Sequence, residues 1–448
     1  MDHSTISIFR QQFADLLKGI NTQFGLLAYQ LGVTTLTQFG FDGTRLRASN
    51  SRSRIVAVAQ LDEIEQPLQK TFAELEQQVA AADAQDEEQL GDASLHRVEQ
   101  KLAKTENRLK AVRRAQAEIA RVQAAQQPVP KRIPLTDPES RLSPNKEGGF
   151  APNDTPLANV DLESGLILDG DVRQNTDEEQ SLVASLEALE ERFAAAGQAV
   201  HVESLAADGL FVTGPNLEDL SERQTTFYGP ITAQPEFVKR ADGRTPIASE
   251  QWPHLPIVVV LKGTLGQPDQ VQLAKEAFLY DAAENCYWCP RGQRLSYTGT
   301  TSEVLKATSR RVERQRYRAA DSACESCPLR RQCLKGEGTS RTLSRDQYDA
   351  HRETLRERML SATASVQRTR RQSEVERPFA VIKHQMGIRQ FLLRGQANVT
   401  KEWRWMTSSA NTQVLIRWWR QHRDRLPNPL LKMIRRAAAR ASPAVVGR

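Results

Sequence analysis

Three acidic residues stand where regular elements are expected to end or to begin. Asp42 lies in the extended segment TLTQFGFDGTRLRAS, Asp208 ends the strand-like run AVHVESLAADG, and Glu376 lies in the helical segment RRQSEVERPFAVIKHQMGIRQFLLRG. Carboxylates at strand ends converge at one edge of an α/β sheet, and a helix can bring a third acid alongside. Three such carboxylates suit two hard divalent cations, Mg²⁺ or Mn²⁺, which promote in-line phosphoryl transfer.

Each acid also has a simpler explanation. Asp42 and Asp208 both precede glycine, and Asp-Gly between extended runs is by itself a hairpin signal. Glu376 could be a surface acid that forms an ion pair with a neighbouring arginine. The spacing of the three residues does not decide between these explanations and a metal site.

The segment around Glu376 has the pattern of an amphipathic helix. Pro378 cannot continue a helix interior without the loss of a hydrogen bond, so it marks a helix start or a bend. Glu376 and Lys383 lie seven residues apart and therefore share a neighbouring face. The apolar stripe has spacings of four, three and four and comprises Val375, Phe379, Ile382 and Met386.

Charge is distributed unevenly along the chain. Residues 301–448 contain 32 Lys and Arg against 13 Asp and Glu, a net charge of +19, whereas residues 1–300 contain 29 against 42, a net charge of −13. Such an excess predicts a polyanionic partner such as DNA, although a basic surface without a ligand is the alternative. The residues expected to contact DNA phosphates surround Glu376 and are Arg370, Arg371, Arg377, Lys383, Arg389 and Arg394.

All five cysteines lie between residues 286 and 333. An odd, clustered set in a chain without a secretion signal argues against a disulfide framework. Cys286-x-x-Cys289 and Cys324-x-x-Cys327, with Cys333 close behind, have the spacing of a structural zinc site. Four thiolates around Zn²⁺ would stabilise a segment that lacks its own core, which leaves one cysteine spare. Reduced or redox-active cysteines without metal are the alternative.

The first part of the chain is expected to be mostly helical. Residues 4–31 predict one helix, and residues 35–49 predict an extended segment. Between residues 58 and 124, two apolar stripes with helical spacing are separated by a polar link, which predicts an antiparallel helical hairpin.

Strands and helices alternate in the middle of the chain. Residues 155–161 and 165–172 predict a β-hairpin, and a helix is expected at 178–196. Asn216 is the predicted N-cap of a short helix. Residues 232–345 break the pattern and predict an inserted subdomain.

Helical patterns return from residue 345 to 386 and from 398 to 422. His384 in the first of them is expected to be solvated. Tryptophans at helical spacing pack in a core more often than they stack on bases, and the second helix carries Trp403, Trp405, Trp418 and Trp419.

Composition bounds the class of protein. A chain of 448 residues is long enough for two or three domains. The mean hydropathy is −0.55, no apolar run reaches membrane-spanning length, and the chain starts without a signal peptide. These features predict a soluble, cytoplasmic protein without a membrane partner.

Five blocks of the sequence together resemble bacterial insertion-sequence transposases of the DDE class. They are FDGTRLRASNSR, TDPESRLSPNKEGGFAPNDTPLANVD, ADGLFVTGPNLEDL, the CP…CESCPLRRQC cluster and VERPFAVIKHQMGIRQFLLRGQANVTKEW. The last block is the most specific. The resemblance covers nearly the whole chain, from Asp2 to about Trp419.

The resemblance implies an α/β fold with a ribonuclease-H-like mixed sheet flanked by helices. It places the catalytic acids on Asp42, Asp208 and Glu376, which would hold two Mg²⁺ or Mn²⁺ ions. The implied activity is metal-dependent cleavage and strand transfer of double-stranded DNA at element ends, by a homo-oligomer associated with the bacterial nucleoid. The recurrent cysteines of the family fall on Cys289, Cys324, Cys327 and Cys333, which makes Cys286 the spare one.

Two departures from the family pattern affect what we expect. Gly209-Leu210-Phe211 stands where relatives usually carry Gly-Tyr, and only 41 residues precede Asp42, where relatives usually carry an upstream DNA-binding region. We therefore expect a truncated N-terminus. The alternatives to a transposase are a truncated, non-catalytic, zinc-containing DNA-binding protein and a nuclease that only hydrolyses DNA.

The expected organisation divides a catalytic core between three segments, with two insertions. The segments are an N-terminal helical remnant at 1–34, the catalytic core at 35–57, 126–231 and 346–424, a helical-hairpin insertion at 58–125, a Cys-rich insertion at 232–345 and a basic tail at 425–448.

Overall fold

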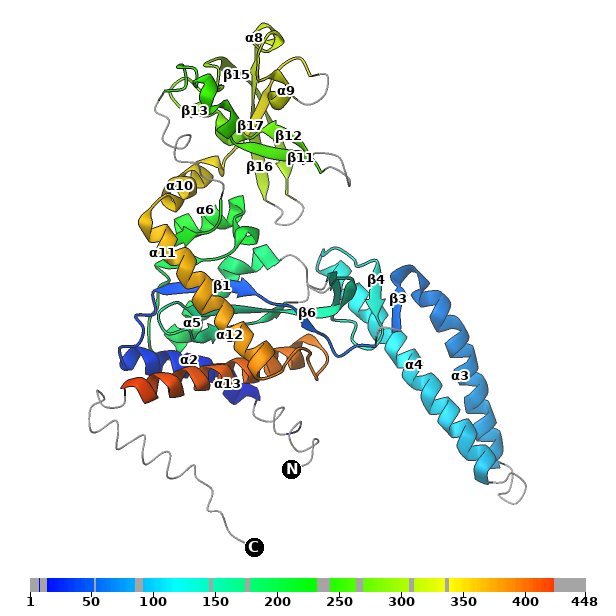
Figure 1. Ribbon diagram of the computed structural model, residues 1–448. Coiled ribbons are helices and arrows are strands. Elements are labelled where there is room, and N and C mark those ends of the chain that lie inside the picture. The colour runs from blue at the N-terminus through cyan, green and yellow to red at the C-terminus, as the bar shows by residue number, and fades with distance from the viewer. Residues whose placement is uncertain are drawn as a thin grey trace. The chain divides into compact units, whose positions relative to one another are not determined.

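The protein forms two compact units of mixed helices and strands (Figure 1). Unit 1 comprises Met1–Glu178, Ser185–His201 and Ser373–Arg448, and unit 2 comprises Glu179–Ala184 and Val202–Gln372. The α/β class is as predicted. The computed structural model describes residues 8, 14–51, 54–84, 92–144, 148–173, 178–231, 242–262, 269–305, 310–334 and 338–422, except the side chains of 14–18, 82–84 and 92–95. The predicted basic tail lies outside these residues.

The sheet of unit 1 is built around one long strand, β6 (Phe150–Asp161), in which eleven of the twelve residues are buried. β1 (Gln38–Gly43) and β2 (Leu46–Arg47) pair with β6 antiparallel, one after the other. Three further strands also pair antiparallel with β6, namely β5 (Arg141–Pro144), β7 (Ile167–Asp169) and β8 (Val172–Arg173). The predicted β-hairpin is therefore present as β6 and β7.

The Asp42-Gly43 dipeptide lies inside β1 and forms no hairpin turn. Asp42 is opposite Ala158, and β2 continues on the same partner strand with Leu46 opposite Asp154. The hairpin interpretation of this dipeptide is wrong, because β1 and β2 form one extended run that is interrupted at residues 44–45. Asp42 therefore has the rigid position of a strand residue.

Helices α2 (Ala14–Gln30), α5 (Leu182–Ala195) and α13 (Gln396–His422) accompany this sheet, and α2 lies beside α13 (Figure 1). Asn411 ties α13 to β7, because its side chain accepts from the Ile167 N–H at 2.9 Å and donates to the Ile167 carbonyl at 2.7 Å. α5 lies within the helix predicted at 178–196, and its fully buried apolar face comprises Leu182, Leu186, Leu189 and Phe193.

The tryptophans of α13 have different environments. Trp403 is fully buried, stacks on Phe379 with ring centroids 6.2 Å apart, and donates from Nε1 to the Leu157 carbonyl at 3.2 Å. It is a core residue, as predicted. The other three are only partly buried, so the core prediction is too strong for Trp405, Trp418 and Trp419.

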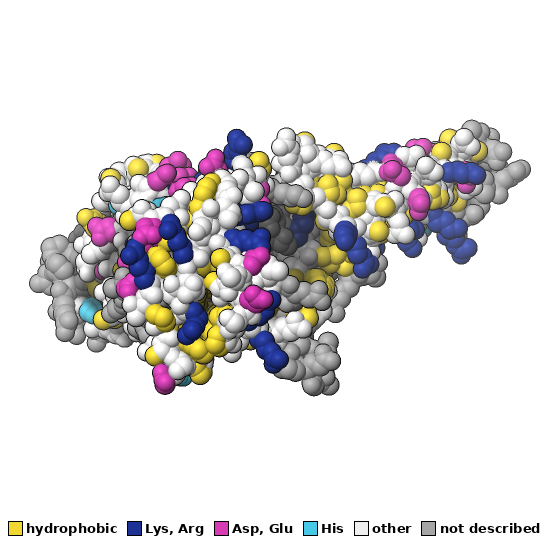
Figure 2. All heavy atoms as spheres, turned by 90° about the horizontal axis from the view of Figure 1, so that it is seen from above, with side chains coloured by type: hydrophobic (Ala, Val, Ile, Leu, Met, Phe, Trp, Pro, Cys, Tyr) yellow, Lys and Arg dark blue, Asp and Glu magenta, His cyan; other side chains and the backbone are white. Residues whose placement is uncertain are grey.

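A helical hairpin extends from unit 1, formed by α3 (Leu61–Ala84) and α4 (Asp92–Ala124) (Figure 1). The short strands β3 (Ile55–Ala57) and β4 (Arg132–Pro134) pair antiparallel at its base. The two predicted apolar stripes meet in the seam, where the buried residues at the base are Leu61, Val112, Ala115, Ile119 and Ile133. Charged side chains are distributed along the outside of the hairpin among apolar and uncharged ones (Figure 2).

Unit 2 begins with two parallel strands, β9 (Ser204–Ala206) and β10 (Thr226–Tyr228), on either side of α6 (Gly214–Glu222). The N-cap of α6 is Thr213, whose hydroxyl accepts from the backbone N–H of Asn216 at 3.4 Å. The prediction of Asn216 as N-cap is wrong. Pro215 fits the first helical turn, so the helix begins earlier in the chain, at Gly214. The buried Asn216 side chain donates instead to two backbone carbonyls.

The Cys-rich part of unit 2 folds around a five-stranded antiparallel sheet. Its strands are β13 (Leu279–Asp281), β14 (Cys286–Trp288), β15 (Arg294–Val304), β16 (Arg311–Ala319) and β17 (Thr342–Asp346). A separate antiparallel pair consists of β11 (Ile257–Leu261) and β12 (Gln270–Leu273). The helices that follow in the described part of the unit are α8 (Asp321–Glu325), α9 (Arg330–Cys333), α10 (Asp349–Met359) and α11 (Ala362–Arg370).

Among the described residues, no helix combines the length and the apolar character that crossing a bilayer requires.

Candidate active site and cysteine cluster

Asp42 lies near the end of β1, which Phe39 and Phe41 anchor in the core without any exposed surface. Its Oδ1 accepts a hydrogen bond from the backbone N–H of Gly43 at 2.8 Å, which orients the carboxylate. A Cβ on Gly43 would lie 2.7 Å from Oε2 of the buried Glu178. A second carboxylate therefore borders the strand next to Asp42. Sequence patterns did not indicate it, because Glu178 is distant in the chain and belongs to no motif.

The Glu376 segment is helical throughout and contains two wider turns. α12 (Glu376–Ala380) lies between π-helical turns at Arg371–Val375 and Val381–Gln385. Pro378 is the third residue of α12 and lies inside this continuous helical run, between the two π-helical turns, so it does not mark a helix start. Three members of the predicted apolar stripe are buried, namely Val375, Phe379 and Ile382, and Met386 is half-buried.

The side chain of Glu376 is exposed, and among the described residues it forms no hydrogen bond or ion pair. The nearest arginine in sequence has another partner, because Arg377 Nη1 donates to Glu374 Oε2 at 3.0 Å. The explanation of Glu376 as an ion-paired surface acid is thus not supported within the described chain. Its carboxylate remains available for a cation or a substrate.

Lys383 connects this helix to the strand that carries Asp42. Its Nζ donates a hydrogen bond to the Thr44 hydroxyl, and both residues belong to unit 1. Thr44 follows Asp42 by two residues, and its own N–H donates to the Pro156 carbonyl at 2.8 Å, so it is held against β6. Lys383 was predicted to contact DNA, and its half-buried ammonium group has a structural partner as well.

Asp208 lies in unit 2, two residues after β9. It is the N-cap of a short 3₁₀ turn, and its Oδ1 accepts from the backbone N–H of Leu210 at 2.9 Å. The carboxylate is half-buried. Asp208 is therefore a strand-end acid that a backbone donor orients, although it also has the capping role of a turn residue.

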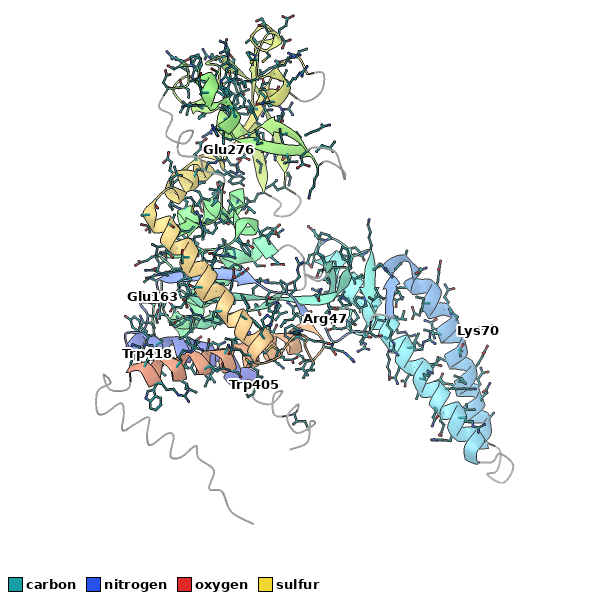
Figure 3. All side chains as sticks on the ribbon, viewed as in Figure 1. Arg47, Lys70, Glu163, Glu276, Trp405 and Trp418 are labelled. Atoms are coloured by element: carbon teal, nitrogen blue, oxygen red, sulfur yellow. The ribbon has the colours of Figure 1, made fainter. Side chains whose placement is uncertain are left out.

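Carboxylates of the TDPES block hold the loop that follows the Glu376 helix. The backbone N–H of Gly395 donates to both oxygens of Asp137, at 3.3 and 3.2 Å, and that of Gln396 donates to Glu139 Oε2 at 2.7 Å. The buried Glu402 accepts from two further loop N–H groups. Arg47 of β2 completes the anchoring, because its backbone N–H and carbonyl both bond the loop (Figure 3).

Asp154 is a buried acid that the sequence did not single out. It lies on β6, is 4 % exposed, and has one carboxylate oxygen without a partner among the described residues. Burial raises the pKa of Asp154 to about 7, and the nearby Asp137, Glu139 and Glu402 act in the same direction, whereas Arg141 opposes them. Unit 1 therefore holds an acid that is partly protonated at neutral pH.

The predicted DNA contacts are divided between the two units. Arg370 and Arg371 belong to unit 2, where both are half-buried. The exposed members in unit 1 are Arg377, Arg389 and Arg394. Arg394 also donates from Nε to the Ser49 carbonyl at 3.0 Å. His384 is exposed, as expected.

Four of the five cysteines line one small cavity of about 30 Å³ in unit 2, namely Cys289, Cys324, Cys327 and Cys333. Cys286 does not line it and is buried at the start of β14. Burial raises the pKa of Cys289 and raises that of Cys333 to about 12. These thiols therefore stay protonated at neutral pH unless a cation stabilises the thiolate.

The surroundings of the cavity suit negatively charged sulfur. The backbone N–H groups of Arg291 and Gln293 both donate to Cys289 Sγ at 3.3 Å, in a turn that Gly292 closes with φ +70°. The guanidinium of the buried Arg341 acts on Cys333 in the direction that favours the thiolate. Thiolate donors, N–H···S bonds and a buried cation fit a structural zinc ion, which these four residues would hold.

The four sulfurs are more widely spaced than in a closed zinc site. Among the described residues, the one set of three or more His, Cys, Asp or Glu ligand atoms within 4.8 Å of one another is Asp281, Glu284 and Cys286. That set has other partners, because Asp281 accepts from Trp288 and from two backbone N–H groups, and Glu284 pairs with Arg244 and Arg294. The described part of unit 1 contains no such set.

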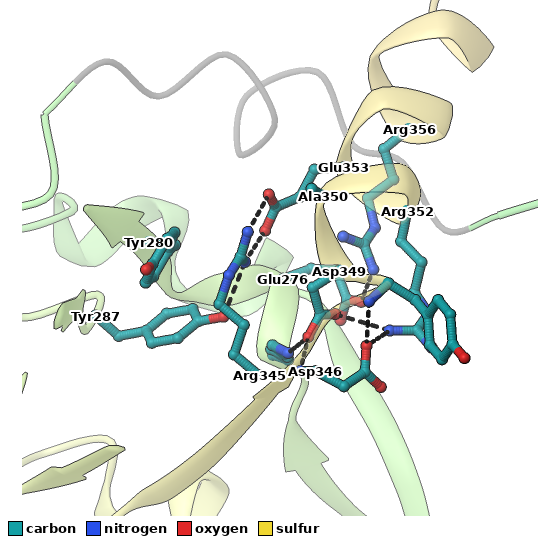
Figure 4. A network of polar contacts seen from close by, with 12 residues as sticks. Glu276, Tyr280, Tyr287, Arg345, Asp346, Asp349, Ala350, Arg352, Glu353 and Arg356 are labelled. Carbon is teal, nitrogen blue, oxygen red and sulfur yellow. Dashed lines mark hydrogen bonds and ion pairs between the residues drawn. The ribbon is translucent and has the colours of Figure 1, made fainter. Parts of the chain in front are cut away.

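A polar network fixes the start of α10 in unit 2 (Figure 4). Asp349 accepts from Lys275 Nζ at 2.5 Å and from Arg352 Nη1 at 3.0 Å, and Arg352 also binds Asp346 at 2.8 Å. Burial favours the neutral acid, but Lys275 and the other donors outweigh it and lower the pKa of Asp349. Arg345 forms a two-pronged pair with Glu353 and lies 3.8 Å from the Tyr280 ring centroid.

Comparison with known protein families identifies one part of the chain. Residues 288–416 match the family described as Transposase DDE domain. The match confirms the resemblance to DDE-class transposases, and it includes Glu376, Lys383 and the four cavity cysteines but neither Asp42 nor Asp208. No curated protein and no solved structure matches the chain. A DDE domain indicates a role in transposition and a nuclease or transposase enzyme that generally uses divalent metal ions.

Proposed function

We propose that the chain is a transposase that cleaves DNA at the ends of a mobile element and joins the freed 3′-hydroxyl to a target phosphodiester. Asp42, Asp208 and Glu376 are the proposed ligands of two Mg²⁺ or Mn²⁺ ions. Carboxylate oxygens are the donors that these ions prefer. When bound, such ions generate the nucleophile and stabilise the leaving oxygen of an in-line displacement.

The hydrogen bond from Lys383 to Thr44 is the observation that carries this proposal. It joins the helix of Glu376 to the strand of Asp42 inside one unit, although more than 330 residues separate the two acids in sequence. Two of the three proposed ligands are the oriented Asp42 and Glu376, which is exposed and has no partner among the described residues. Asp208 is included because of the family resemblance and its position beyond the end of β9.

The remaining residues of the proposed site act on the substrate and on the site geometry. Lys383 and Thr44 keep the helix and the strand in register. The exposed Arg377, Arg389 and Arg394 hold phosphates of double-stranded DNA through charge and hydrogen bonds. We also propose that Cys289, Cys324, Cys327 and Cys333 bind a structural Zn²⁺ with Cys286 as a bystander.

The test uses supercoiled plasmid with Mg²⁺ or Mn²⁺ and a labelled duplex that ends in a free 3′-hydroxyl. The parent protein should nick the plasmid and join the duplex to it, whereas Glu376→Gln should do neither while still binding DNA. Glu374→Gln is the control, because it removes the same charge two residues away. Equal cleavage by the parent and Glu376→Gln would reject Glu376 as a ligand.

The outcomes also separate the rival functions. Nicking without joining would identify a nuclease that only hydrolyses DNA. DNA binding and zinc content without any metal-dependent cleavage would identify a non-catalytic DNA-binding protein.

A further inference from the structure

One exposed flank of α4 carries a continuous row of basic side chains, which we call the α4 basic stripe. Its four members follow one another at spacings of four, three and four residues, so they lie on one face of the helix. All four are exposed, and they are Arg97, Lys101, Lys104 and Arg108. Lys and Arg side chains are visible along the hairpin in Figure 2.

Within the described chain, none of the four stripe residues forms an ion pair with an acidic side chain. Elsewhere on α4, Lys110 pairs with Glu106 at 2.5 Å, and Arg113 pairs with Glu65 at 3.0 Å. None of the four stripe residues has Asp or Glu three or four positions away in either direction. Within the described chain, the pairing that normally offsets charge on a helix surface is therefore missing from all four residues of this row.

The stripe also has an energetic disadvantage for the isolated helix. Each successive pair of its members is a like-charge pair at three or four residues, and each pair destabilises a helix by about 0.2–0.5 kcal/mol. The hairpin does not need the stripe for packing, because Val112, Ala115 and Ile119 fill the seam with α3. The stripe therefore does not stabilise the hairpin, and its main physical effect is a positive electrostatic potential on this face of α4.

The opposite charge is found on the partner helix. Leu61–Ala84 contains six acidic residues and one lysine, whereas Asp92–Ala124 contains eight basic and four acidic residues. The hairpin therefore has a basic helix and an acidic helix. A polyanion would approach α4 and avoid α3.

We propose that the α4 basic stripe binds the phosphate backbone of double-stranded DNA, at a site separate from the arginines around Glu376. The identity of the polyanion rests on the proposed function. From residue 97 to residue 108 the stripe is roughly 16 Å long, because a helix rises 1.5 Å per residue. That length can span a major groove about 12 Å wide and reach phosphates on both of its edges. The stripe contains no aromatic or apolar member that would anchor a protein partner.

The test compares two variants that lose the same charge from the same hairpin. The stripe variant is Arg97→Gln, Lys101→Gln, Lys104→Gln and Arg108→Gln together. The control is Lys70→Gln, Lys110→Gln, Arg113→Gln and Arg114→Gln together, of which Lys70 lies on α3 (Figure 3). Binding to a 40-base-pair duplex is measured without divalent metal, from about 50 to 200 mM salt.

We expect the stripe variant to bind at least about tenfold more weakly than the parent at the lowest salt, with a salt slope lower by roughly two to four units. The control should lose less than half of that slope. Equal losses in both variants would overturn the proposal, because they would reflect net charge alone. Unchanged DNA binding with altered self-association in sedimentation would overturn it in favour of an acidic protein partner.

Circular dichroism establishes that each variant remains helical. If the fourfold variant does not fold, two double variants replace it, Arg97→Gln/Lys101→Gln and Lys104→Gln/Arg108→Gln. Each should produce about half of the effect on DNA binding, and parental binding by both would overturn the proposal.

The plasmid assay distinguishes this inference from the proposed function. If the protein never cleaves the plasmid but the stripe variant binds DNA more weakly, the inference holds and the proposed function fails. If the protein cleaves the plasmid and the stripe variant binds DNA as the parent does, the proposed function holds and the inference fails.

Discussion

The sheet of unit 1 and the Cys-rich sheet of unit 2 are stabilised in different ways. In unit 1 a twelve-residue strand with eleven buried residues gathers five other strands, and helices supply large apolar side chains such as Phe193 and Trp403. The smaller sheet of unit 2 has a modest core around Tyr287 and Tyr317. Cysteines at one end and an ion network at the start of α10 supplement that core.

The difference matters because removing one group from a polar network or from the proposed metal site has a different effect on stability from removing one apolar side chain. Packing is distributed over many side chains, so single losses are moderate. A metal site or a buried ion network concentrates its contribution in a few groups, and the loss of one partner leaves the others unsatisfied. Unit 1 uses buried and half-buried carboxylates for another purpose, because Asp137, Glu139 and Glu402 hold the loop beyond the Glu376 helix.

The largest expected effect is on the cysteine cluster. Cys324→Ser should reduce the zinc content from about one ion per chain to near zero and destabilise unit 2 by on the order of 5 kcal/mol, because the proposed metal would supply folding energy there. Elemental analysis and thermal unfolding measure the two effects. Cys286→Ala is the control and should retain zinc. A parent protein without zinc, or a Cys324→Ser variant that retains it, would contradict the proposed ligand set.

A smaller loss is expected from the ion network in unit 2. Asp349→Ala leaves Lys275 and Arg352 without their shared carboxylate and should lower the free energy of unfolding by about 3–5 kcal/mol. Glu353→Gln is the control, because its side chain is 41 % exposed and the change should remove less than about 1 kcal/mol. Urea unfolding measures both. Equal effects would show that burial does not distinguish the two pairs.

Asp154 provides the corresponding test in unit 1. Its folded-state pKa of about 7 lies above the ordinary value of 3.8, so the folded chain holds an extra proton between these values. The free energy of unfolding should therefore fall as pH rises from about 4 to 7, and the full penalty should be present above pH 7.

Asp154→Asn removes this titration. The difference in the free energy of unfolding between the variant and the parent should increase, in favour of the variant, by on the order of 1–4 kcal/mol as pH rises from 4 to 8. The size of the pKa difference sets this range. Urea midpoints at pH 4.5 and pH 8 measure the gain. Parallel pH profiles for the parent and the variant would show that Asp154 is ionised normally in the folded protein.

The smallest effect in free energy concerns the contact between the helix and the strand of the proposed site. Lys383→Met and Thr44→Val each remove one charge-assisted hydrogen bond and should slow plasmid cleavage by about 10- to 100-fold, corresponding to roughly 1.5–3 kcal/mol. The double variant should be no slower than either single variant, because both remove the same contact. Fully additive losses in cleavage rate would show that the two residues act separately.

The sequence by itself determined the features that depend on local spacing. The apolar stripes of α3, α4 and α5 have helical spacing, and the helices are present where these patterns lie. The Cys-x-x-Cys pairs lie within fewer than fifty residues, so short turns bring four cysteines to one cavity. Strands β6 and β7 were also recognisable, because turn residues separate two runs of β-branched or apolar residues.

Only the tertiary structure decided which distant residues meet. Asp42-Gly43 reads as a turn in isolation, and it is a strand because β6 pairs with both β1 and β2. The positions of Glu178 beside Gly43, of Asp154 in the core and of Lys383 on Thr44 follow from contacts between segments more than a hundred residues apart. Local propensity contains no information about such contacts, because they form only when the buried faces of separate elements pack together.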